Sequence, residues 1–275
     1  MSPALLWMIF FLVIPAAIIL FYSFFKKGLY GGIDTVWTFA NYERASEAIY
    51  LKIVWDSFKL AAFTSFLCLL IGYPMAYVMA TSRSSWRNAL MILLVIPFWT
   101  NLVVRTYAIK LLLGDQGPVN EFLVWTGLIS EPIPFANSYA SVVFGMVTNY
   151  LPFMVLPLYV TLEKFDFSLL EAGRDLGASS WDLLTNVLLP LTKSGIVTGC
   201  LLVFTPALGE FLIPDLLGGA RTMLIGNLII DQFLKMRDWP FGSALSMLLM
   251  AVVVVTLMIC MRWWSDESSD SKERT

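Results

Sequence analysis

The sequence predicts an all-α protein that crosses a membrane several times. Of its 275 residues, 58% are hydrophobic and only 14% are charged, whereas soluble domains are about 25% charged. Apolar runs of about 20 residues recur along the chain, which is the length that a helix needs to cross the hydrocarbon core of a bilayer. Six such runs are present, so we expect six transmembrane helices.

The first expected span lies in residues 1–25 and contains Pro15. Its start lacks the basic residues and the small-residue cleavage site of a secretory signal peptide, so we expect it to remain as a membrane helix. A polar, glycine-containing loop follows over residues 26–54.

The other five spans are expected within residues 55–262, at about residues 55–80, 89–113, 138–162, 191–213 and 240–262. A short link over residues 81–88 carries Arg83 and Arg87, and residues 263–275 form a charged tail. The lysines and arginines divide equally between the two predicted sides of the membrane, so the positive-inside rule does not orient the chain.

Several classes of function are excluded by what the sequence lacks. It contains no His, which excludes His-ligated metal sites and His-based catalytic triads. Cys68, Cys200 and Cys260 lie far apart in apolar runs, so we expect single small side chains rather than disulfides. The phosphate-binding pattern G-x-x-x-x-G-K-[ST] is missing, and the net charge of −2 indicates no nucleic-acid partner. We therefore expect neither an enzyme nor a protein that itself holds a metal or a cofactor.

Residues 164–190, between the fourth and fifth spans, form a charged and helix-prone loop. Ser168 followed by Glu171 fits a capping box, which predicts a short helix that starts near Leu169. Gly177 suits the left-handed position that ends such a helix.

A second helix start follows in the same loop. Ser179 and Asp182 predict a helix that runs through Trp181 toward Pro190. The loop should therefore consist of two short helices with a glycine corner between them. Taken alone, this pattern also fits an ordinary amphipathic connector between two membrane helices.

The same loop resembles the cytoplasmic coupling loop of the permease subunits of ABC importers. That loop has the pattern E-A-A, three residues, G, nine residues, I, one residue and L-P. The match here is E-A-G at residues 171–173, Gly177, and V-L-L-P at residues 187–190, so Gly173 and Val187 replace an Ala and an Ile. The resemblance implies a type I importer permease fold. It also implies that the ATPase is contacted through Glu171, Ala172, Gly173, Asp175, Leu176, Gly177 and Pro190.

Further stretches, spread over most of the chain, are similar to the permeases of spermidine/putrescine importers. They are Gly72-Tyr73-Pro74, residues 96–101 (IPFWTN), residues 151–154 (LPFM), Gly209-Glu210-Phe211, residues 215–219 (DLLGG), Ile225-Gly226-Asn227 and residues 237–240 (RDWP). By this resemblance, the chain would translocate polyamines together with a second homologous permease, an ATPase dimer that binds ATP and Mg²⁺, and an extracytoplasmic solute-binding protein. It would lie in the bacterial cytoplasmic membrane with both termini in the cytoplasm.

Polar side chains at membrane depth are costly and are therefore candidates for a transport path. They are Trp99, Asn101 and Tyr107 in the third span, Asn149 and Tyr150 in the fourth, and Glu210 and Asp215 around the end of the fifth. A carboxylate beside aromatic rings suits a cationic amine, because it supplies a charge partner and cation–π faces. These residues also have structural interpretations, as interfacial aromatic side chains, hydrogen bonds between helices, or acids that face water at headgroup level.

Other functions share some of these features. An importer permease for another solute, such as an opine, ferric ion or thiamine, would have the same coupling loop. An ion-coupled secondary carrier would need paired ionisable residues in mid-membrane and inverted repeats, and a membrane-embedded enzyme would need a nucleophile with its base. The sequence offers neither set. Among importers of this kind, selectivity is expected to be shared with the binding protein.

Overall fold

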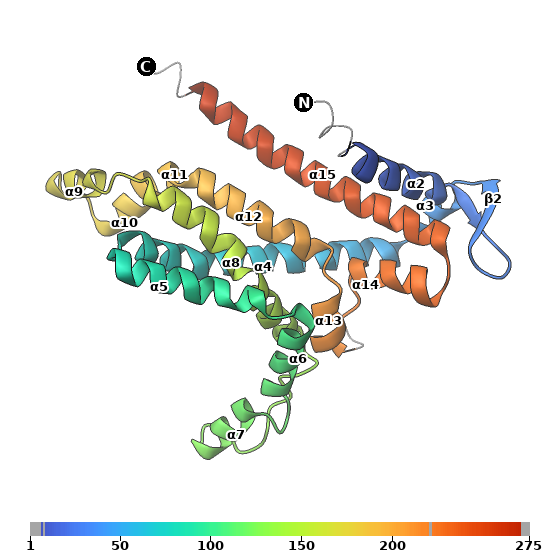
Figure 1. The fold of residues 1–275 in the computed structure, drawn as a ribbon, viewed down its shortest axis with the longest axis horizontal. Helices are drawn as coiled ribbons and strands as arrows, with labels where there is room; N and C mark the ends of the chain where they lie inside the picture. The colour runs from blue at the N-terminus through green and yellow to red at the C-terminus, as the bar shows by residue number, and fades with distance from the viewer. Residues whose placement is uncertain (1–6, 8, 220–221, 271–275) are drawn as a thin grey trace. The chain divides into compact units, whose positions relative to one another are not determined.

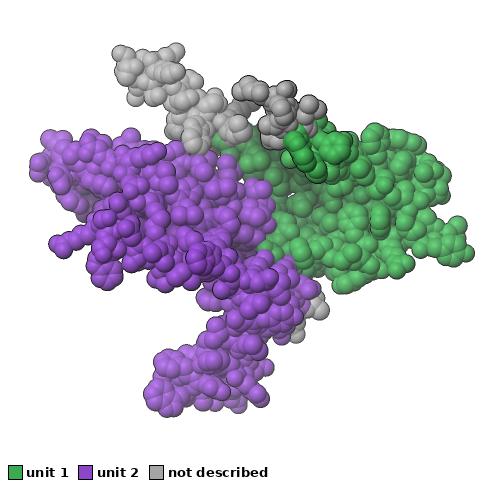
Figure 2. Space-filling model, viewed as in Figure 1, with its two compact units in different colours: residues 1–58, 208–211, 223–275 green, residues 59–207, 212–222 purple. Residues whose placement is uncertain are grey.

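The computed structural model describes residues 7, 9–219 and 222–270, with side chains described as far as residue 260 (Figure 1). Within this part of the chain the regular structure is helical apart from one two-stranded hairpin. The predicted all-α class is therefore confirmed. The chain divides into two compact units, which are residues 1–58, 208–211 and 223–275 (unit 1) and residues 59–207 and 212–222 (unit 2) (Figure 2).

Unit 1 contains the N-terminal part of the chain and the last long helix. Its elements are the π-helix η1 (Ile9–Val13), α2 (Ile14–Ser23), β1 (Phe25–Lys27), β2 (Ile33–Trp37), α3 (Ala40–Ala45), the first part of α4 (Ala48–Thr81), α14 (Ile225–Ile230), the π-helix η5 (Asp231–Lys235) and α15 (Trp239–Asp270).

Unit 2 contains the middle of the chain, including the charged loop. Its elements are the rest of α4, α5 (Ser84–Val95), the 3₁₀-helix η2 (Ile96–Trp99), α6 (Leu102–Leu112), α7 (Pro118–Trp125), α8 (Tyr139–Glu163), α9 (Ser168–Asp175), α10 (Ser180–Leu183), the π-helix η3 (Leu184–Leu188), α11 (Leu189–Leu191), most of α12 (Lys193–Leu208) and α13 (Leu212–Leu217).

Three helices in the described chain are long and apolar enough to cross a membrane: Ala48–Thr81, Tyr139–Glu163 and Trp239–Cys260. Two bent pairs also pass when each is taken together: Ser84–Trp99 with Leu102–Leu112, bent by 98°, and Ser180–Leu191 with Lys193–Leu208, bent by 69°. The spans thus number three, or up to five if each pair is one span, with a shorter apolar helix at Ile9–Ser23. Six spans remain a prediction, and the expected start of the first lies outside the described residues.

Two helices extend beyond the limits expected from the sequence. The second span begins at Ala48 rather than near residue 55, because Ile49 and Ile53 continue an apolar helical face into the predicted loop. The last helix continues to Asp270, into the predicted tail, since neither Gly nor Pro interrupts residues 261–270.

Close approach through glycine holds two helices of unit 2 together. A Cβ added at Gly195 of α12 would lie 2.5 Å from Thr161 Oγ1, and one at Gly199 would lie 2.7 Å from Met154 Sδ, both on α8. Gly195 and Gly199 form a G-x-x-x-G pair, which lets membrane helices pack backbone to backbone. Similarly, a Cβ at Gly72 of α4 would lie 3.1 Å from Met154 Cγ. Helix α8 is therefore the centre around which α4 and α12 pack.

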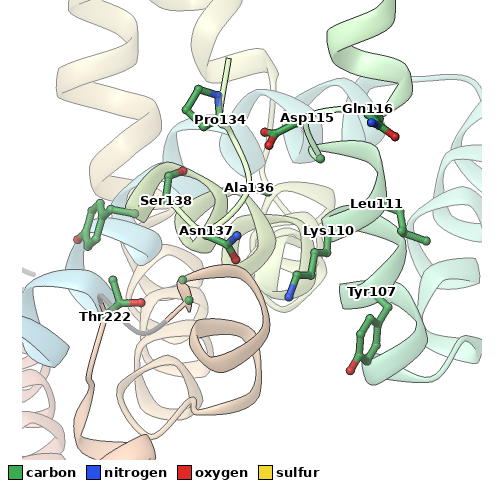
Figure 3. Close-up of a pocket in the computed structure, with 15 residues that line it drawn as sticks. Tyr107, Lys110, Leu111, Asp115, Gln116, Pro134, Ala136, Asn137, Ser138 and Thr222 are labelled. Carbon is green, nitrogen blue, oxygen red and sulfur yellow. The ribbon is translucent and has the colours of Figure 1, made fainter. Parts of the chain in front are cut away.

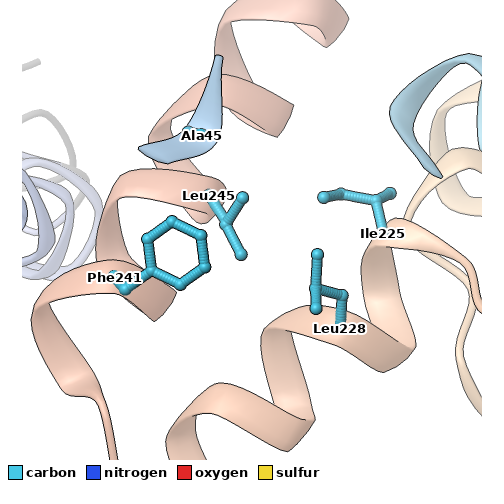
Figure 4. Packing of buried hydrophobic residues seen from close by; sticks show 5 residues of the cluster. All are labelled: Ala45, Ile225, Leu228, Phe241 and Leu245. Atoms are coloured by element: carbon cyan, nitrogen blue, oxygen red, sulfur yellow. The ribbon is translucent and has the colours of Figure 1, made fainter. Parts of the chain in front are cut away.

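The core of unit 1 is a cluster of buried apolar side chains from α3, α14 and α15. Its members are Ala45, Ile225, Leu228, Phe241 and Leu245 (Figure 4). This cluster fixes the start of the last long helix against the short helices that precede it.

Strands β1 and β2 form an antiparallel hairpin within the predicted loop at residues 26–54. Its turn contains Gly31 and Gly32, whose φ angles of 90° and 81° are readily adopted only by glycine. The sequence predicted a polar, glycine-containing loop here, and neither the turn nor the paired strands were predicted.

Candidate functional site

The first helix of the charged loop begins where expected but is capped differently. Helix α9 starts at Ser168, one residue before the predicted start near Leu169, with Phe167 as its N-cap residue. The predicted capping box of Ser168 and Glu171 is wrong, because Asp166 Oδ1 accepts the hydrogen bond from the Ser168 amide at 3.0 Å. Hydrogen bonds from Ser168 hold the pKa of Asp166 below its usual value. An aspartate two residues before a helix forms this local turn readily.

The helix ends as predicted, at the glycine corner. Gly177 has a φ of 86°, and its amide donates to Arg174 O at 2.9 Å while the Ala178 amide donates to Gly173 O at 3.0 Å. These two bonds make a complete Schellman motif, which satisfies carbonyls that the helix end would otherwise leave without a donor. The corner therefore has a defined geometry.

The second capping box is confirmed. The Asp182 amide donates to Ser179 Oγ at 3.2 Å and the Ser179 amide donates to Asp182 Oδ2 at 3.2 Å. Hydrogen bonds from Ser179 lower the pKa of Asp182. The helix then runs from Ser180 to Leu191, but it widens into the π-helix η3 just before Pro190, whose missing N–H removes one regular helical bond.

The two helices together present an exposed face. Leu170 and Leu183 are buried beneath it, and Gly173 lies so close to Leu183 that a Cβ there would displace the leucine side chain. This contact accounts for the glycine that replaces the second alanine of the family pattern. The other predicted coupling residues are exposed, and Leu176 is 89% exposed; they are Glu171, Ala172, Asp175, Leu176, Gly177 and Pro190.

The loop is attached to α4 by two contacts. Tyr77 packs edge-on against Phe167 with ring centroids 6.0 Å apart. Tyr73 Oη shares a hydrogen bond of 2.9 Å with Thr192 Oγ1, at the 69° bend that ends the loop. Tyr73 belongs to the Gly72-Tyr73-Pro74 stretch noted in the sequence. A displacement of the loop would therefore also move α4 and α12.

In the third expected span, Trp99 and Asn101 lie at the 98° break, whereas Tyr107 lies further along α6. Asn101 caps α6, since its Oδ1 accepts from the Val103 amide at 2.8 Å. Arg105 Nη1 donates to Pro97 O across the break at 2.9 Å. Trp99 is 88% exposed in this single chain. Asn101 thus stabilises the start of α6, while the ring of Trp99 lies on the surface of the subunit.

The polar stretch of α8 lies next to this break. The ring centroids of Phe98 and Phe153 lie 5.1 Å apart in edge contact, and those of Tyr150 and Phe153 lie 6.3 Å apart. Asn149 is buried, and its Nδ2 donates to Gly145 O at 2.7 Å. Among the described residues its Oδ1 has no hydrogen-bond partner. The fold thus brings together two of the stretches that carry the family resemblance.

Tyr107 lines a separate cleft of about 1540 Å³ in unit 2 (Figure 3). Lys110 from the same helix, Asn137 and Ser138 from the segment before α8, and Thr222 from the segment after α13 also line it. Polar and apolar residues both line this partly open cleft, so Tyr107 belongs to its wall and not to the helix break.

Glu210 occupies the break between α12 and α13. It is only 8% exposed, and its Oε1 accepts from the Phe211 amide at 3.0 Å. Asp215, in contrast, is exposed on α13. The headgroup-level interpretation therefore suits Asp215 better than it suits Glu210.

Asn227 was not predicted as a site residue, yet it lies at the break that carries Glu210. Its Nδ2 donates to Phe211 O at 2.9 Å, and its Oδ1 is buried without a partner in the described part of the chain. A Cβ on the preceding Gly226 would lie 2.9 Å from Glu210 O. The two family-like stretches at residues 209–211 and 225–227 therefore form one structure, although nothing in the sequence connects them.

Comparison with known proteins identifies the family. Residues 68–267 match the family described as binding-protein-dependent transport system inner membrane component. The spermidine/putrescine transport system permease protein PotB of Escherichia coli (strain K12) is 42% identical over 257 residues, which are 94% of this chain and 93% of that protein. The PotB protein of Haemophilus influenzae is 42% identical over 256 residues, with 93% and 90% covered.

A more distant relative and a solved structure are also similar to this chain. The molybdenum transport system permease protein ModB of Azotobacter vinelandii is 30% identical over 177 residues, which are 63% of this chain and 76% of that protein. A crystal structure of a bacterial ABC transporter that imports the polysaccharide alginate has the same fold, with a TM-score of 0.73 and 18% identity over 95% of this chain and 92% of that one. The chain therefore belongs to the family of binding-protein-dependent transport system inner-membrane components.

Proposed function

We propose that this chain is the membrane-spanning permease subunit of an ATP-driven importer that carries polyamines such as spermidine and putrescine across the bacterial cytoplasmic membrane. The observation that carries this proposal is the nearly buried carboxylate of Glu210 at a helix break, to which Asn227 is hydrogen-bonded through Phe211 O. The 42% identity to spermidine/putrescine permeases over most of the chain supports it.

The chemistry of the break suits a primary ammonium group. An ammonium group is a donor with no acceptor, so it needs oxygen atoms around it. Glu210 supplies a carboxylate, and Asn227 supplies an amide oxygen that is buried without a partner among the described residues. A charged hydrogen bond of this kind contributes about 1.5–3 kcal/mol. In unit 2, Trp99 and Tyr107 offer aromatic faces, which are also suited to cationic groups.

The exposed face of the coupling loop is assigned to contact with an ATPase dimer. The chain has no nucleotide-binding motif of its own, so ATP and Mg²⁺ are bound by that partner. Closure of the ATPase dimer would displace α9. The contacts of Phe167 with Tyr77 and of Thr192 with Tyr73 then carry the displacement to α4 and α12. A second homologous permease completes the path, and an extracytoplasmic binding protein delivers the solute.

The proposed orientation places the coupling loop and both termini in the cytoplasm. Arg87 pairs with Glu163 at 3.1 Å, so the short basic link at residues 81–88 lies on the same side as the loop. Two arginines in such a short link favour the cytoplasmic side.

Uptake of radiolabelled spermidine and putrescine into proteoliposomes that contain the whole importer tests the role of Glu210. We expect Glu210→Gln to reduce uptake about tenfold or more, because the variant keeps the shape but loses the charge partner of the ammonium. The matched control is Glu131→Gln, which removes the same charge from an exposed loop residue and should leave uptake unchanged. Equal uptake by the wild type and by Glu210→Gln would contradict the assignment.

A further inference from the structure

The break between η2 and α6 interrupts the helical hydrogen bonds of the third expected span. Helix η2 ends at Trp99, and α6 begins at Leu102 after a change of direction of 98°. The last carbonyls of a helix have no donor within that helix, and lipid cannot replace water as a hydrogen-bond donor. A break within a membrane span therefore needs donors from nearby side chains.

Three donors converge on one carbonyl at this break. Pro97 O accepts from the Thr100 amide at 3.3 Å, from Thr100 Oγ1 at 2.7 Å and from Arg105 Nη1 at 2.9 Å. The two bonds from Thr100 are local, because they join residues three positions apart. The bond from Arg105 spans eight positions and runs from α6 back to η2. Arg105 thus bridges the break.

The guanidinium of Arg105 is turned inward to make this bond. The side chain is partly buried, and its Nε is buried without a hydrogen-bond partner among the residues that the structure describes. A cationic side chain is costly within a membrane span, which makes Arg105 a candidate for a function. Because like charges repel each other, direct contact with a cationic solute is disfavoured, and the bond to Pro97 O indicates a role in holding the backbone.

The segment that this bridge holds carries Trp99. On one side of Trp99, the ring of Phe98 packs edge-on against Phe153 of α8, with the centroids 5.1 Å apart. On the other side, Asn101 Oδ1 accepts from the Val103 amide at 2.8 Å. Trp99 lies between these two anchored residues, and its own ring is exposed. The direction of the ring is therefore set by the backbone of the break.

We propose that Arg105 is a positioning residue, which keeps the break bent and thereby fixes Trp99 where it meets the polyamine. This inference rests on the proposed function, in which Trp99 offers an aromatic face to cationic groups. A ring that is already held in place binds a cation without the further entropy cost of ordering the side chain. Loss of the bridge should therefore change the geometry of the break and weaken transport through Trp99.

The geometry can be measured in the purified importer, without any solute, as the distance between two spin labels. Leu93→Cys and Val104→Cys place the labels on either side of the break, at residues that are 66% and 65% exposed. The three native cysteines are replaced by Ser in this background; they are Cys68, Cys200 and Cys260. We expect one narrow distance distribution when Arg105 is present.

Arg105→Met removes all the donors of the side chain and leaves a flexible apolar one. We expect it to shift and broaden the distance distribution, because Pro97 O then keeps only its local bonds from Thr100. The control is Lys52→Met, which removes a positive charge from an exposed position of α4 and should leave the distribution unchanged. An unchanged distribution in Arg105→Met would overturn the inference.

A double-mutant cycle on spermidine uptake into proteoliposomes tests whether Arg105 acts through Trp99. We expect Arg105→Met and Trp99→Ala each to lower uptake about tenfold. The double variant should be no slower than either single variant, because both changes remove the same contact. Losses that multiply in the double variant would show that Arg105 acts independently of Trp99, and faster uptake by Arg105→Met would show that its charge acts on the solute itself. Either result would overturn the inference.

The same measurements separate this inference from the proposed function. Wild-type uptake by Trp99→Ala would remove Trp99 from the proposed path and overturn the transport part of the inference, while the label distances would still decide whether Arg105 holds the break. An importer that takes up thiamine and no polyamine would overturn the proposed substrate. The uptake cycle with thiamine would then decide whether Arg105 positions Trp99 for that solute.

Discussion

The proposed coupling loop, residues 164–190, turns at Gly177, whose φ of 86° costs a non-glycine residue about 1–2 kcal/mol. We predict that Gly177→Asp leaves the importer assembled but reduces ATP-driven uptake about tenfold or more, because it both strains the corner and adds a charge to the face assigned to the ATPase. Uptake by reconstituted importer measures this effect.

The matched control is Gly127→Asp. Gly127 also has a positive φ, of 71°, and open space around its Cα, so the variant imposes the same strain and charge elsewhere. We expect it to transport like the wild type. If the two variants transport equally well, the coupling role of the loop is wrong.

At the residue scale, a predicted capping box was confirmed where no other nearby side chain competed for the same amide. Ser179 and Asp182 form the box that their spacing indicates. Ser168 and Glu171 have the same spacing, but Asp166 lies two residues before Ser168 and caps its amide first. Competition between neighbouring polar side chains is decided by geometry that a sequence pattern does not contain.

At the scale of elements, the contact between α8 and α12 depends on Gly199, which faces Met154. We predict that Gly199→Leu destabilises the subunit by about 1–3 kcal/mol through overpacking, which a lower melting temperature of the purified importer would reveal. Ser194→Leu adds an apolar side chain at an exposed position of the same helix and should have little effect. Equal melting temperatures for the two variants would show that this packing is not needed.

Hydropathy predicted where apolar segments lie but not where the helices bend. The third expected span breaks by 98° at Asn101, and the 69° bend at Thr192 lies where the loop meets the fifth expected span. The length of an apolar run indicates whether a segment can cross the bilayer, but it does not indicate whether the helix axis bends within the segment. The break at Asn101 did leave a signal, since Pro97 disrupts a helix and an asparagine four residues later can cap a new one.

At the scale of the whole molecule, the proposed orientation predicts which surfaces an impermeant thiol reagent reaches in intact cells. Tyr30→Cys should be labelled from outside. Trp181→Cys, on the exposed coupling loop, should be labelled only after the cells are permeabilised. The wild type, whose Cys68 is buried and whose Cys200 and Cys260 are partly buried, provides the background. Labelling of Trp181→Cys in intact cells would contradict the proposed orientation.

Contacts between distant segments were the part that the sequence could not provide. Residues 225–227 of α14 pack against the helix break at residues 209–211, and the hairpin is bound to Arg237 and Asp238 much later in the chain. Each stretch was visible as a family-like motif. Their association depends on tertiary packing, which no local pattern encodes.

The central claim is that this subunit couples ATP hydrolysis to polyamine import. The most direct measurement is the ATPase rate of the reconstituted importer with its binding protein either empty or loaded with spermidine, putrescine, thiamine or ferric ion. The proposal predicts that only the polyamine-loaded protein raises the rate, and that Gly177→Asp abolishes the increase. Stimulation by thiamine or ferric ion with none by a polyamine would contradict it.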